Sequence, residues 1–240
     1  AGADYEYVKT FVPDEAWKGE RVFVEFESVY RAPEVYVNGE LVASRPYGYL
    51  PVSADITDKL VWGKENEVRV IAHNAEQPNS RWYTGAGPYR PAYLYVMPKE
   101  HILPYGVRIK TTDHEKRAFS LSVATNAAGE VSAEIKDGGK VLWSGKAETD
   151  GSSPALLSGE VPGAELWSAD SPSLYTLEVK FGDDSRELSF GFRTIEWSAK
   201  TGILINGKRE LLRGACIHHD NGPIGAIAHP FAEERKVKLL

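Results

Sequence analysis

The sequence predicts a mainly β protein, with two antiparallel β-sandwiches in succession and then one strand and the start of one helix. Two observations predict the sandwiches. Short segments of alternating apolar and polar residues recur along most of the chain, as in half-buried strands. Asn-Gly and Asp-Gly-Gly turns separate several of them. Residues 231–240 differ, because acidic residues precede basic ones there, an order that suits a helix dipole.

Residues 1–100 are expected to form the first sandwich, a jelly roll. The segment 34–44, EVYVNGELVAS, predicts a hairpin, since Asn38 and Gly39 both tolerate the positive φ of a tight turn. Other strands are expected at 5–12, 21–29, 52–56, 65–72 and 92–97, and Asn66-Glu67 is interpreted as a turn before one of them. About seven short strands between turn residues indicate this architecture.

Residues 101–197 are expected to form an immunoglobulin-like sandwich. Turns at 126–130, 137–139 and 182–184 separate segments that alternate well. This spacing suits a domain of about 100 residues. The expected strands are 107–111, 119–125, 131–136, 141–143, 175–179 and 187–192.

Residues 198–240 form the third piece. It begins with a hairpin around Asn206-Gly207 and continues into an apolar segment, 211–217, which predicts a buried strand with Cys216 inside it. A helix is expected from Phe231. Strand followed by helix is the first step of a β/α repeat. The strand is followed by His218, His219 and Asp220, and proton-active side chains at a strand end are a candidate site.

Composition excludes several functions. The net charge is −6 and the basic residues are scattered, so no surface for nucleic acid or an anionic membrane is indicated. No apolar run reaches the length of a membrane span. The single cysteine excludes an internal disulfide. A metal site at 218–220 is disfavoured, because neighbouring side chains on an extended segment point to opposite sides.

Five segments, in order, resemble glycoside hydrolase family 2, the group of β-galactosidases, β-glucuronidases and β-mannosidases. The ending HHD-x-G is similar to β-galactosidase-like members, whereas Pro88 departs from the β-branched residue usual there. The segments are VYVNGELVASRPYGYLPVSADITDKL (35–60), RWYTGAGPYR (81–90), LWSADSPSLYTLEV (166–179), GFRTIE (191–196) and NGKRELLRGACIHHD (206–220).

The resemblance implies a galactose-binding-like jelly roll at 1–100, an immunoglobulin-like sandwich at 101–197 and the start of a truncated (β/α)8 catalytic barrel at 198–240. It implies a full-length enzyme that hydrolyses terminal β-glycosides with retention of anomeric configuration, and β-galactosides are the expected substrates. The family places its two catalytic carboxylates on later barrel strands. We therefore expect no catalytic residue in this chain and no activity from it alone.

The resemblance also implies partners and cofactors. The expected partner is a carbohydrate, with neither nucleic acid nor membrane. Mg or Na ions used by some full-length members would be held largely by residues outside this chain. The compartment, bacterial cytoplasm or periplasm, is left open. The apolar piece 211–240 is expected to pack on the second sandwich, to associate with another copy as a homo-oligomer, or to be poorly ordered.

Six residues are the predicted substrate-binding set: Arg81, Trp82, Tyr83, His218, His219 and Asp220. The resemblance implies that the jelly-roll loop reaches the pocket and that His218 contacts sugar hydroxyls. Alternatives stay open for both. Residues 81–83 could instead form an ordinary loop at a domain interface, and His218 could instead be a structural histidine held by hydrogen bonds. Together with the aromatic loop 47–49, residues 81–83 also suit a stand-alone carbohydrate-binding module.

Overall fold

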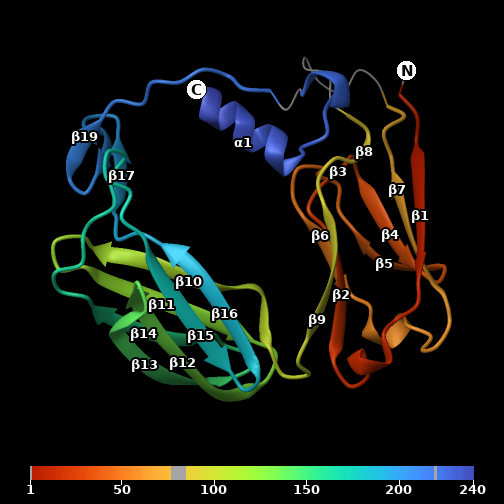
Figure 1. Ribbon diagram of the computed structural model, residues 1–240, viewed down its shortest axis with the longest axis horizontal. Helices are drawn as coiled ribbons and strands as arrows, with labels where there is room; N and C mark the ends of the chain where they lie inside the picture. Colours follow the sequence, from red (N-terminus) through yellow and green to blue (C-terminus); the bar gives the residue numbers. More distant parts are fainter. Residues whose placement is uncertain (1, 77–84, 219–220) are drawn as a thin grey trace. The chain divides into compact units, whose positions relative to one another are not determined.

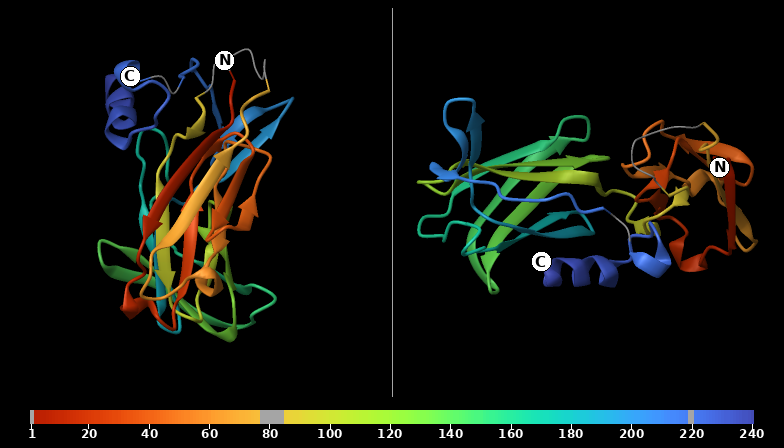
Figure 2. Two further views of the ribbon diagram at one scale, coloured as in Figure 1. Left: turned by 90° about the vertical axis from the view of Figure 1, so that its right-hand side faces the viewer. Right: turned by 90° about the horizontal axis from the view of Figure 1, so that it is seen from above.

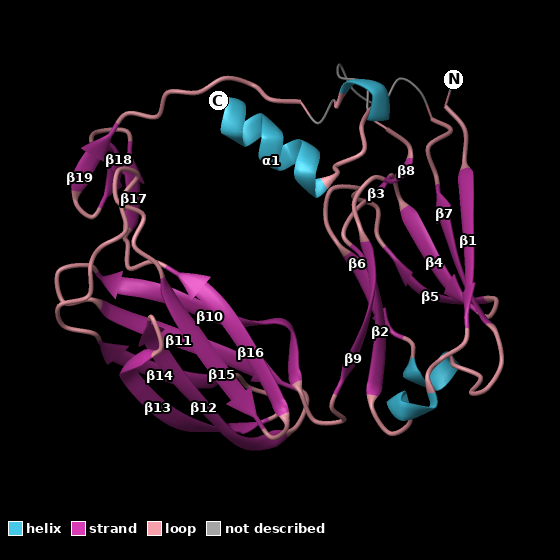
Figure 3. Cartoon of the chain, viewed as in Figure 1, coloured by secondary structure: helices cyan, strands magenta, loops and turns pink. Residues whose placement is uncertain are grey.

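The computed structural model describes residues 2–76, 85–218 and 221–240 (Figure 1). The chain is mainly β, as predicted, and strands dominate both compact units (Figure 3). One unit comprises Ala1–Met97 with Ala215–Leu240, and the other comprises Pro98–Gly214. Each unit encloses its own hydrophobic core. Among the described residues, no helix is long and apolar enough to cross a bilayer.

The first unit is an antiparallel sandwich whose strands run from red to yellow in Figure 2. Its sheets have the orders β1-β7-β4-β5 and β6-β2-β9, and β3 pairs with β8. Two 3-10 turns, η1 (Glu15–Trp17) and η2 (Thr57–Lys59), lie between strands. The strands are β1 (Tyr5–Phe11), β2 (Arg21–Phe26), β3 (Val29–Tyr30), β4 (Pro33–Val37), β5 (Glu40–Ser44), β6 (Val52–Asp55), β7 (Asn66–Ala72), β8 (Gly87–Pro88) and β9 (Ala92–Met97).

Alternation in these strands builds the core of the first unit, because every second side chain points inward. Val22, Val35 and Val70 are almost completely buried. The predicted β4–β5 hairpin is confirmed, and Asn38 and Gly39 have φ of 50° and 85°. The strand expected at 65–72 is confirmed as β7, whereas the interpretation of Asn66-Glu67 as a turn before a strand is wrong. Asn66 is the fully buried first residue of β7, and its side-chain amide bonds both the N–H and the carbonyl of Val61.

The second unit is a seven-stranded sandwich with sheets β10-β11-β14 and β13-β12-β15-β16. Phe119, Trp143 and Phe192 form edge-to-face ring contacts in its core. Strand β14 was not anticipated, and β12 begins inside the turn expected at 126–130. The strands are β10 (Ile102–Asp113), β11 (Ala118–Thr125), β12 (Ala128–Asp137), β13 (Lys140–Asp150), β14 (Ala155–Glu160), β15 (Tyr175–Phe181) and β16 (Asp184–Phe190).

A small sheet follows in the same unit: β17 (Ile195–Ser198), β18 (Gly202–Ile205) and β19 (Lys208–Glu210). The predicted hairpin between β18 and β19 is confirmed, with φ of 51° at Asn206 and 74° at Gly207. Residues 215–240 group with the first unit and contain η3 (Gly222–Ile224) and α1 (Pro230–Leu239). The helix was predicted from Phe231, one residue later than its start.

The strand predicted at 211–217 is not formed. Leu211 and Leu212 are 68% and 74% exposed, and Cys216 is also exposed rather than in a core. A strand needs a neighbour for its backbone N–H and C=O groups and a layer to cover its side chains. No strand in the described ranges pairs with this segment. The apolar pattern alone therefore did not determine its structure.

Candidate functional site

Only one of the six predicted binding residues, His218, lies within the described part of the structure. Arg81, Trp82 and Tyr83, and likewise His219 and Asp220, lie outside the described residues. His218 is exposed, and its backbone carbonyl accepts a hydrogen bond from Nζ of Lys236 at 3.4 Å. The site is therefore built from the described segments on either side of these residues.

The segment after residue 84 is fixed to the first sandwich through β8. Gly87–Pro88 pairs with β3, and the Tyr7 hydroxyl donates to the carbonyl of Ala86 at 3.4 Å. Gly87 has φ of 81°, and a Cβ at this position would lie 2.0 Å from the Tyr7 hydroxyl oxygen. Only glycine satisfies both conditions. The close approach of β1 thus sets the backbone path of this segment.

Four tyrosines gather beside β8: Tyr30, Tyr47, Tyr49 and Tyr89. The ring centroid of Tyr49 lies 5.1 Å from that of Tyr30, 5.4 Å from that of Tyr47 and 6.3 Å from that of Tyr89. The Tyr89 hydroxyl donates to the carbonyl of Gly48 at 3.4 Å. We call this group the tyrosine cluster. Only its 47–49 part was noticed in the sequence, since the β3–β8 pairing is what brings Tyr30 and Tyr89 to it.

The tyrosine cluster combines exposed ring faces with hydroxyl groups. Tyr47 and Tyr49 are 55% and 41% exposed. Burial, with the neighbouring Tyr30 second, raises the pKa of Tyr49 to about 12. Its phenol therefore stays protonated and can donate a hydrogen bond throughout the physiological range. Apolar ring faces beside neutral hydroxyls suit a ligand with C–H faces and hydroxyl groups, such as a sugar.

The chain that follows residue 220 returns to the same place. The N–H of Ala228 donates to the carbonyl of Tyr89 at 3.0 Å, and a Cβ at Gly85 would lie 3.1 Å from that of Ala226. Asn221 stabilises the returning loop through Nδ2, which donates to the carbonyl of Ile227 at 2.9 Å and to Glu233 at 2.7 Å. The described segments that follow the two predicted stretches, 81–83 and 218–220, therefore contact each other.

The segment before residue 77 is anchored by charged groups. His73 follows β7, and its Nδ1 lies 3.2 Å from Oδ2 of Asp4 while its Nε2 lies 3.3 Å from Oε2 of Glu34. The other Asp4 oxygen accepts the N–H of Ala75 at 3.0 Å. Arg31, next to Tyr30, pairs with Glu76. Residues 73–76 are thus held between β1 and β4.

The charges of this anchor shift one another's ionisation. Hydrogen bonds to Asp4 and then Glu34 raise the pKa of His73. The His73 hydrogen bond lowers the pKa of Asp4, and the Tyr36 hydroxyl, followed by His73, lowers that of Glu34. A neutral imidazole donates through one nitrogen only, so bridging both carboxylates requires the protonated ring.

The described residues contain no cluster of side-chain metal ligands. Within 2–76, 85–218 and 221–240, no group of three or more His, Cys, Asp or Glu side chains could hold a metal ion. The Mg or Na ions implied by the resemblance therefore find no such ligand set in the described part of the chain.

Comparison with known proteins gives a consistent result. A model of glycosyl hydrolases family 2 matches residues 101–193. The β-galactosidase BoGH2A of Bacteroides ovatus is 34% identical over 98% of this chain and 30% of its own length. A protein of Formosa agariphila described as a putative β-glucuronidase is 33% identical, over 91% of this chain and 22% of its own length.

Solved structures agree with these sequences. A β-glycosidase from Bacteroides vulgatus has a TM-score of 0.85 at 31% identity, with 100% of this chain and 32% of that chain covered. A β-glucuronidase from Bifidobacterium dentium, at 24% identity and a TM-score of 0.86, shows the shared fold. The chain spans 22–41% of the length of the curated relatives compared.

Proposed function

The chain belongs to glycosyl hydrolases family 2, and from this premise we propose that it is the substrate-facing, non-catalytic portion of a retaining β-glycosidase. The complete protein would cleave terminal β-glycosides, with β-galactosides as the preferred class. Support for galactosides comes from the HHD-x-G motif that begins at His218 and from the similarity to the Bacteroides ovatus β-galactosidase.

One observation carries this proposal: residues 221–229 contact the segment that begins at Gly85, beside the tyrosine cluster. The described segments that follow the two predicted stretches, 81–83 and 218–220, therefore lie in one region of the first unit. In the proposed role, Arg81, Trp82 and Tyr83 line the sugar pocket with His218, His219 and Asp220. The arginine fork and the histidines would bond hydroxyls, while aromatic rings pack against C–H faces.

The proposed lack of activity rests on the resemblance to the family, which places both catalytic carboxylates on later barrel strands, and on what retention requires. A retaining glycosidase uses two carboxyl groups about 5–5.5 Å apart, one as nucleophile and one as acid and base. Among the six proposed binding residues, only Asp220 is a carboxylic acid. These six residues can bind and orient a sugar, but they cannot supply both catalytic groups.

The first experiment measures hydrolysis of 4-nitrophenyl β-D-galactopyranoside by this chain and by the complete product of its gene. We expect turnover only from the complete protein, with the β-anomer as the first product by proton NMR. An α-anomer formed first would overturn retention. Turnover by the 240-residue chain that survives repurification would overturn its non-catalytic role.

A second candidate function is a stand-alone carbohydrate-binding module, which the exposed faces of Tyr47 and Tyr49 favour. Calorimetry of the chain against a panel of galactosides separates the two functions. Micromolar binding that Tyr49→Ala abolishes and Tyr5→Ala preserves would favour the module. Tyr5 is a matched control, since it is 40% exposed, against 41% for Tyr49, and is not one of the four clustered tyrosines.

A further inference from the structure

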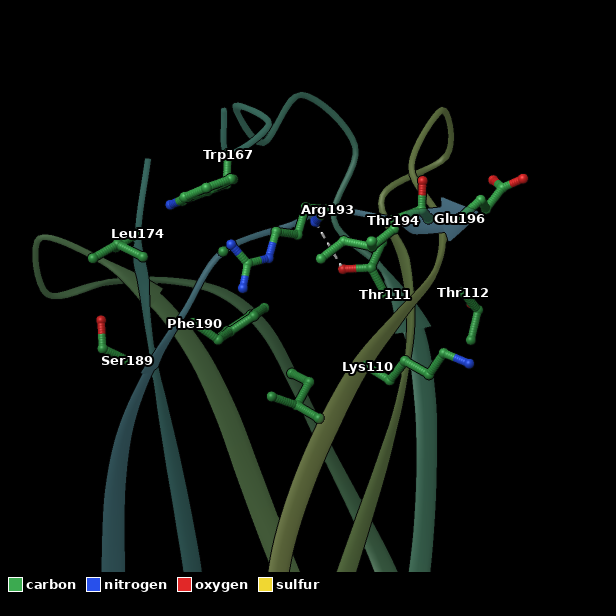
Figure 4. A pocket seen from close by; sticks show the side chains of 13 residues that line it. Lys110, Thr111, Thr112, Trp167, Leu174, Ser189, Phe190, Arg193, Thr194 and Glu196 are labelled. Atoms are coloured by element: carbon green, nitrogen blue, oxygen red, sulfur yellow. Dashed lines mark hydrogen bonds between the residues drawn. The ribbon is translucent and has the colours of Figure 1, made fainter. Parts of the chain in front are cut away.

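The second unit contains a cavity of about 620 Å³. It lies near the ends of β10 and β16, and its volume falls within the range of about 300–1,000 Å³ typical of ligand pockets. All its lining residues belong to residues 98–214. The side chains that define it are shown in Figure 4. The cavity is independent of the tyrosine cluster, which belongs to the first unit.

Arg193 is the best-positioned charged group in this cavity. Its guanidinium carbon lies 4.2 Å from the ring centroid of Trp167. Its backbone N–H donates to Oγ1 of the buried Thr111 at 3.1 Å, and the N–H of Trp167 donates to the carbonyl of Phe192 at 3.0 Å. Backbone and ring contacts therefore fix where the guanidinium lies. Such stacking leaves the N–H edge of arginine available to an anion.

The guanidinium extends into the side of the cavity bounded by Trp167, Leu174 and Phe190 (Figure 4). Within the described residues, no carboxylate or carbonyl oxygen is hydrogen-bonded to this guanidinium. Leu174 is 56% exposed, so the wall beside the guanidinium presents apolar surface to solvent. An anion held here would have an apolar body or ring face next to its charged group.

The opposite side of the cavity is polar. Lys110, Thr112 and Glu196 lie there, away from the Arg193 guanidinium (Figure 4). Two cations, Lys110 and Arg193, and one carboxylate, Glu196, give the lining an excess of one positive charge. A ligand with one carboxylate matches this excess. A dianion such as a phosphate monoester matches it less well, because Glu196 would repel the second charge.

We propose that this cavity binds a sugar acid, a pyranose ring with one carboxylate. The carboxylate pairs with the planar fork of Arg193, the geometry in which arginine binds carboxylates most specifically. One ring face packs on Leu174 and Phe190. The hydroxyl groups reach Lys110, Thr112 and Glu196. This site goes beyond the proposed hydrolytic function and does not depend on it.

The test is a titration of the ¹⁵N-labelled 240-residue chain with sodium D-glucuronate, followed by NMR. The Trp167 indole N–H signal, assigned with Trp167→Phe, is the local probe. D-Glucose is the neutral control with the same ring. N-acetyl-aspartate amide supplies a carboxylate without a sugar ring. We expect saturable shifts with glucuronate and at least ~10-fold weaker binding of glucose, because charge-assisted hydrogen bonds contribute strongly.

Variants link binding to the cavity. We expect Arg193→Gln to weaken glucuronate binding at least ~10-fold and Arg193→Lys to weaken it less, since lysine keeps the charge but loses the fork. Arg213→Gln is the matched control, because Arg213 is an exposed arginine of the same unit that does not line the cavity. Thermal unfolding of each variant confirms that the second unit is folded.

Three results would overturn the proposal. These are equal binding of glucose and glucuronate, unchanged binding by folded Arg193→Gln, and the absence of saturation up to about 50 mM, which corresponds to negligible affinity. If N-acetyl-aspartate amide binds as tightly as glucuronate and its binding depends on Arg193, the cavity is a carboxylate site without preference for a sugar ring, and the sugar-acid proposal is overturned. Failure of the hydrolysis test above would leave the predicted glucuronate binding unchanged.

Discussion

The two sandwiches and the C-terminal piece 211–240 differ in how far they bury similar apolar side chains. Leu177, in the second sandwich, is fully buried, whereas Leu212 is 74% exposed. Helix α1 has no buried residue, and Phe231 is 76% exposed. The sandwiches cover their apolar residues with neighbouring strands, and the C-terminal piece does not. Stability should therefore depend on the sandwiches, and association should depend on the C-terminal piece.

The largest expected effect comes from a matched pair of leucine truncations. Leu177→Ala should lower the free energy of unfolding of the second unit by about 2–5 kcal/mol, because it removes buried surface and leaves a cavity. Leu212→Ala should change it by less than about 0.5 kcal/mol, as exposed substitutions usually do. Urea unfolding of both variants measures the difference. Equal losses would show that Leu212 is covered in solution.

A pair of glycine substitutions tests the same comparison through the backbone. Gly87→Ala should cost about 2–3 kcal/mol, because the new methyl meets the Tyr7 hydroxyl at 2.0 Å and φ is 81°. Gly225→Ala also has a positive φ, 62°, but nothing lies within 4 Å of the new methyl, so only the backbone strain of about 1–2 kcal/mol remains. Thermal unfolding of the first unit reports both. A larger loss at Gly225 would contradict this ordering.

The exposed apolar residues predict weak self-association, as expected of an uncovered patch. The double variant Leu211→Ser with Leu212→Ser should weaken any dimer at least ~10-fold, since each buried leucine contributes about 1.5–3 kcal/mol. Sedimentation velocity over a range of concentrations measures this. The control is Leu156→Ser, another leucine 74% exposed but located in the second sandwich. Equal weakening by the control would argue against association through residues 211–212.

The smallest expected effect is the pH dependence of the anchor at His73. The raised pKa of His73 means that its contribution is complete below the ordinary value of 6.5 and is lost as pH rises through the folded value. The pKa values of Asp4 and Glu34 are lowered. Their contributions to stability are therefore complete above the ordinary values, 3.8 for Asp4 and 4.5 for Glu34, and are lost as pH falls through the folded values. The bridge is therefore complete between 4.5 and 6.5.

An NMR titration of the His73 ring should give a pKa above about 6.5, the ordinary histidine value. Asp4→Asn should bring it closer to that value, since one of the two bridging carboxylates is removed. A His73 pKa that is unchanged in Asp4→Asn would show that the contact at 3.2 Å is not maintained in solution.

Local chemistry made the turns of this fold predictable. Asn38-Gly39 and Asn206-Gly207 adopt the positive φ values that their residue types favour, and the alternation of β2 and β7 gave the inward faces. The segment 211–217 was not predictable, because an apolar run becomes a strand only with a partner. The strand β14 was missed because Leu156 is apolar but exposed, so apolar and polar residues do not alternate along it as burial does.

The candidate site was less accessible to sequence reasoning. Tyr30 and Tyr89 lie far apart in the sequence, and only the β3–β8 pairing brings them together. The cavity at Arg193 likewise depends on long-range packing between Trp167, Thr111 and the end of β16. The roles of Arg81, Trp82, Tyr83, His219 and Asp220 stay predictions.

The return of residues 221–229 to Tyr89 also has a mechanical consequence. Because residues 215–240 belong to the first unit, residues 98–214 form an insertion that lies outside the path of a force applied to the two chain ends, as long as the first unit is intact. Tension would cross the hydrogen bond between Ala228 and Tyr89 before it reached the second sandwich. In an optical trap, the inserted sandwich should bear no load until that contact ruptures.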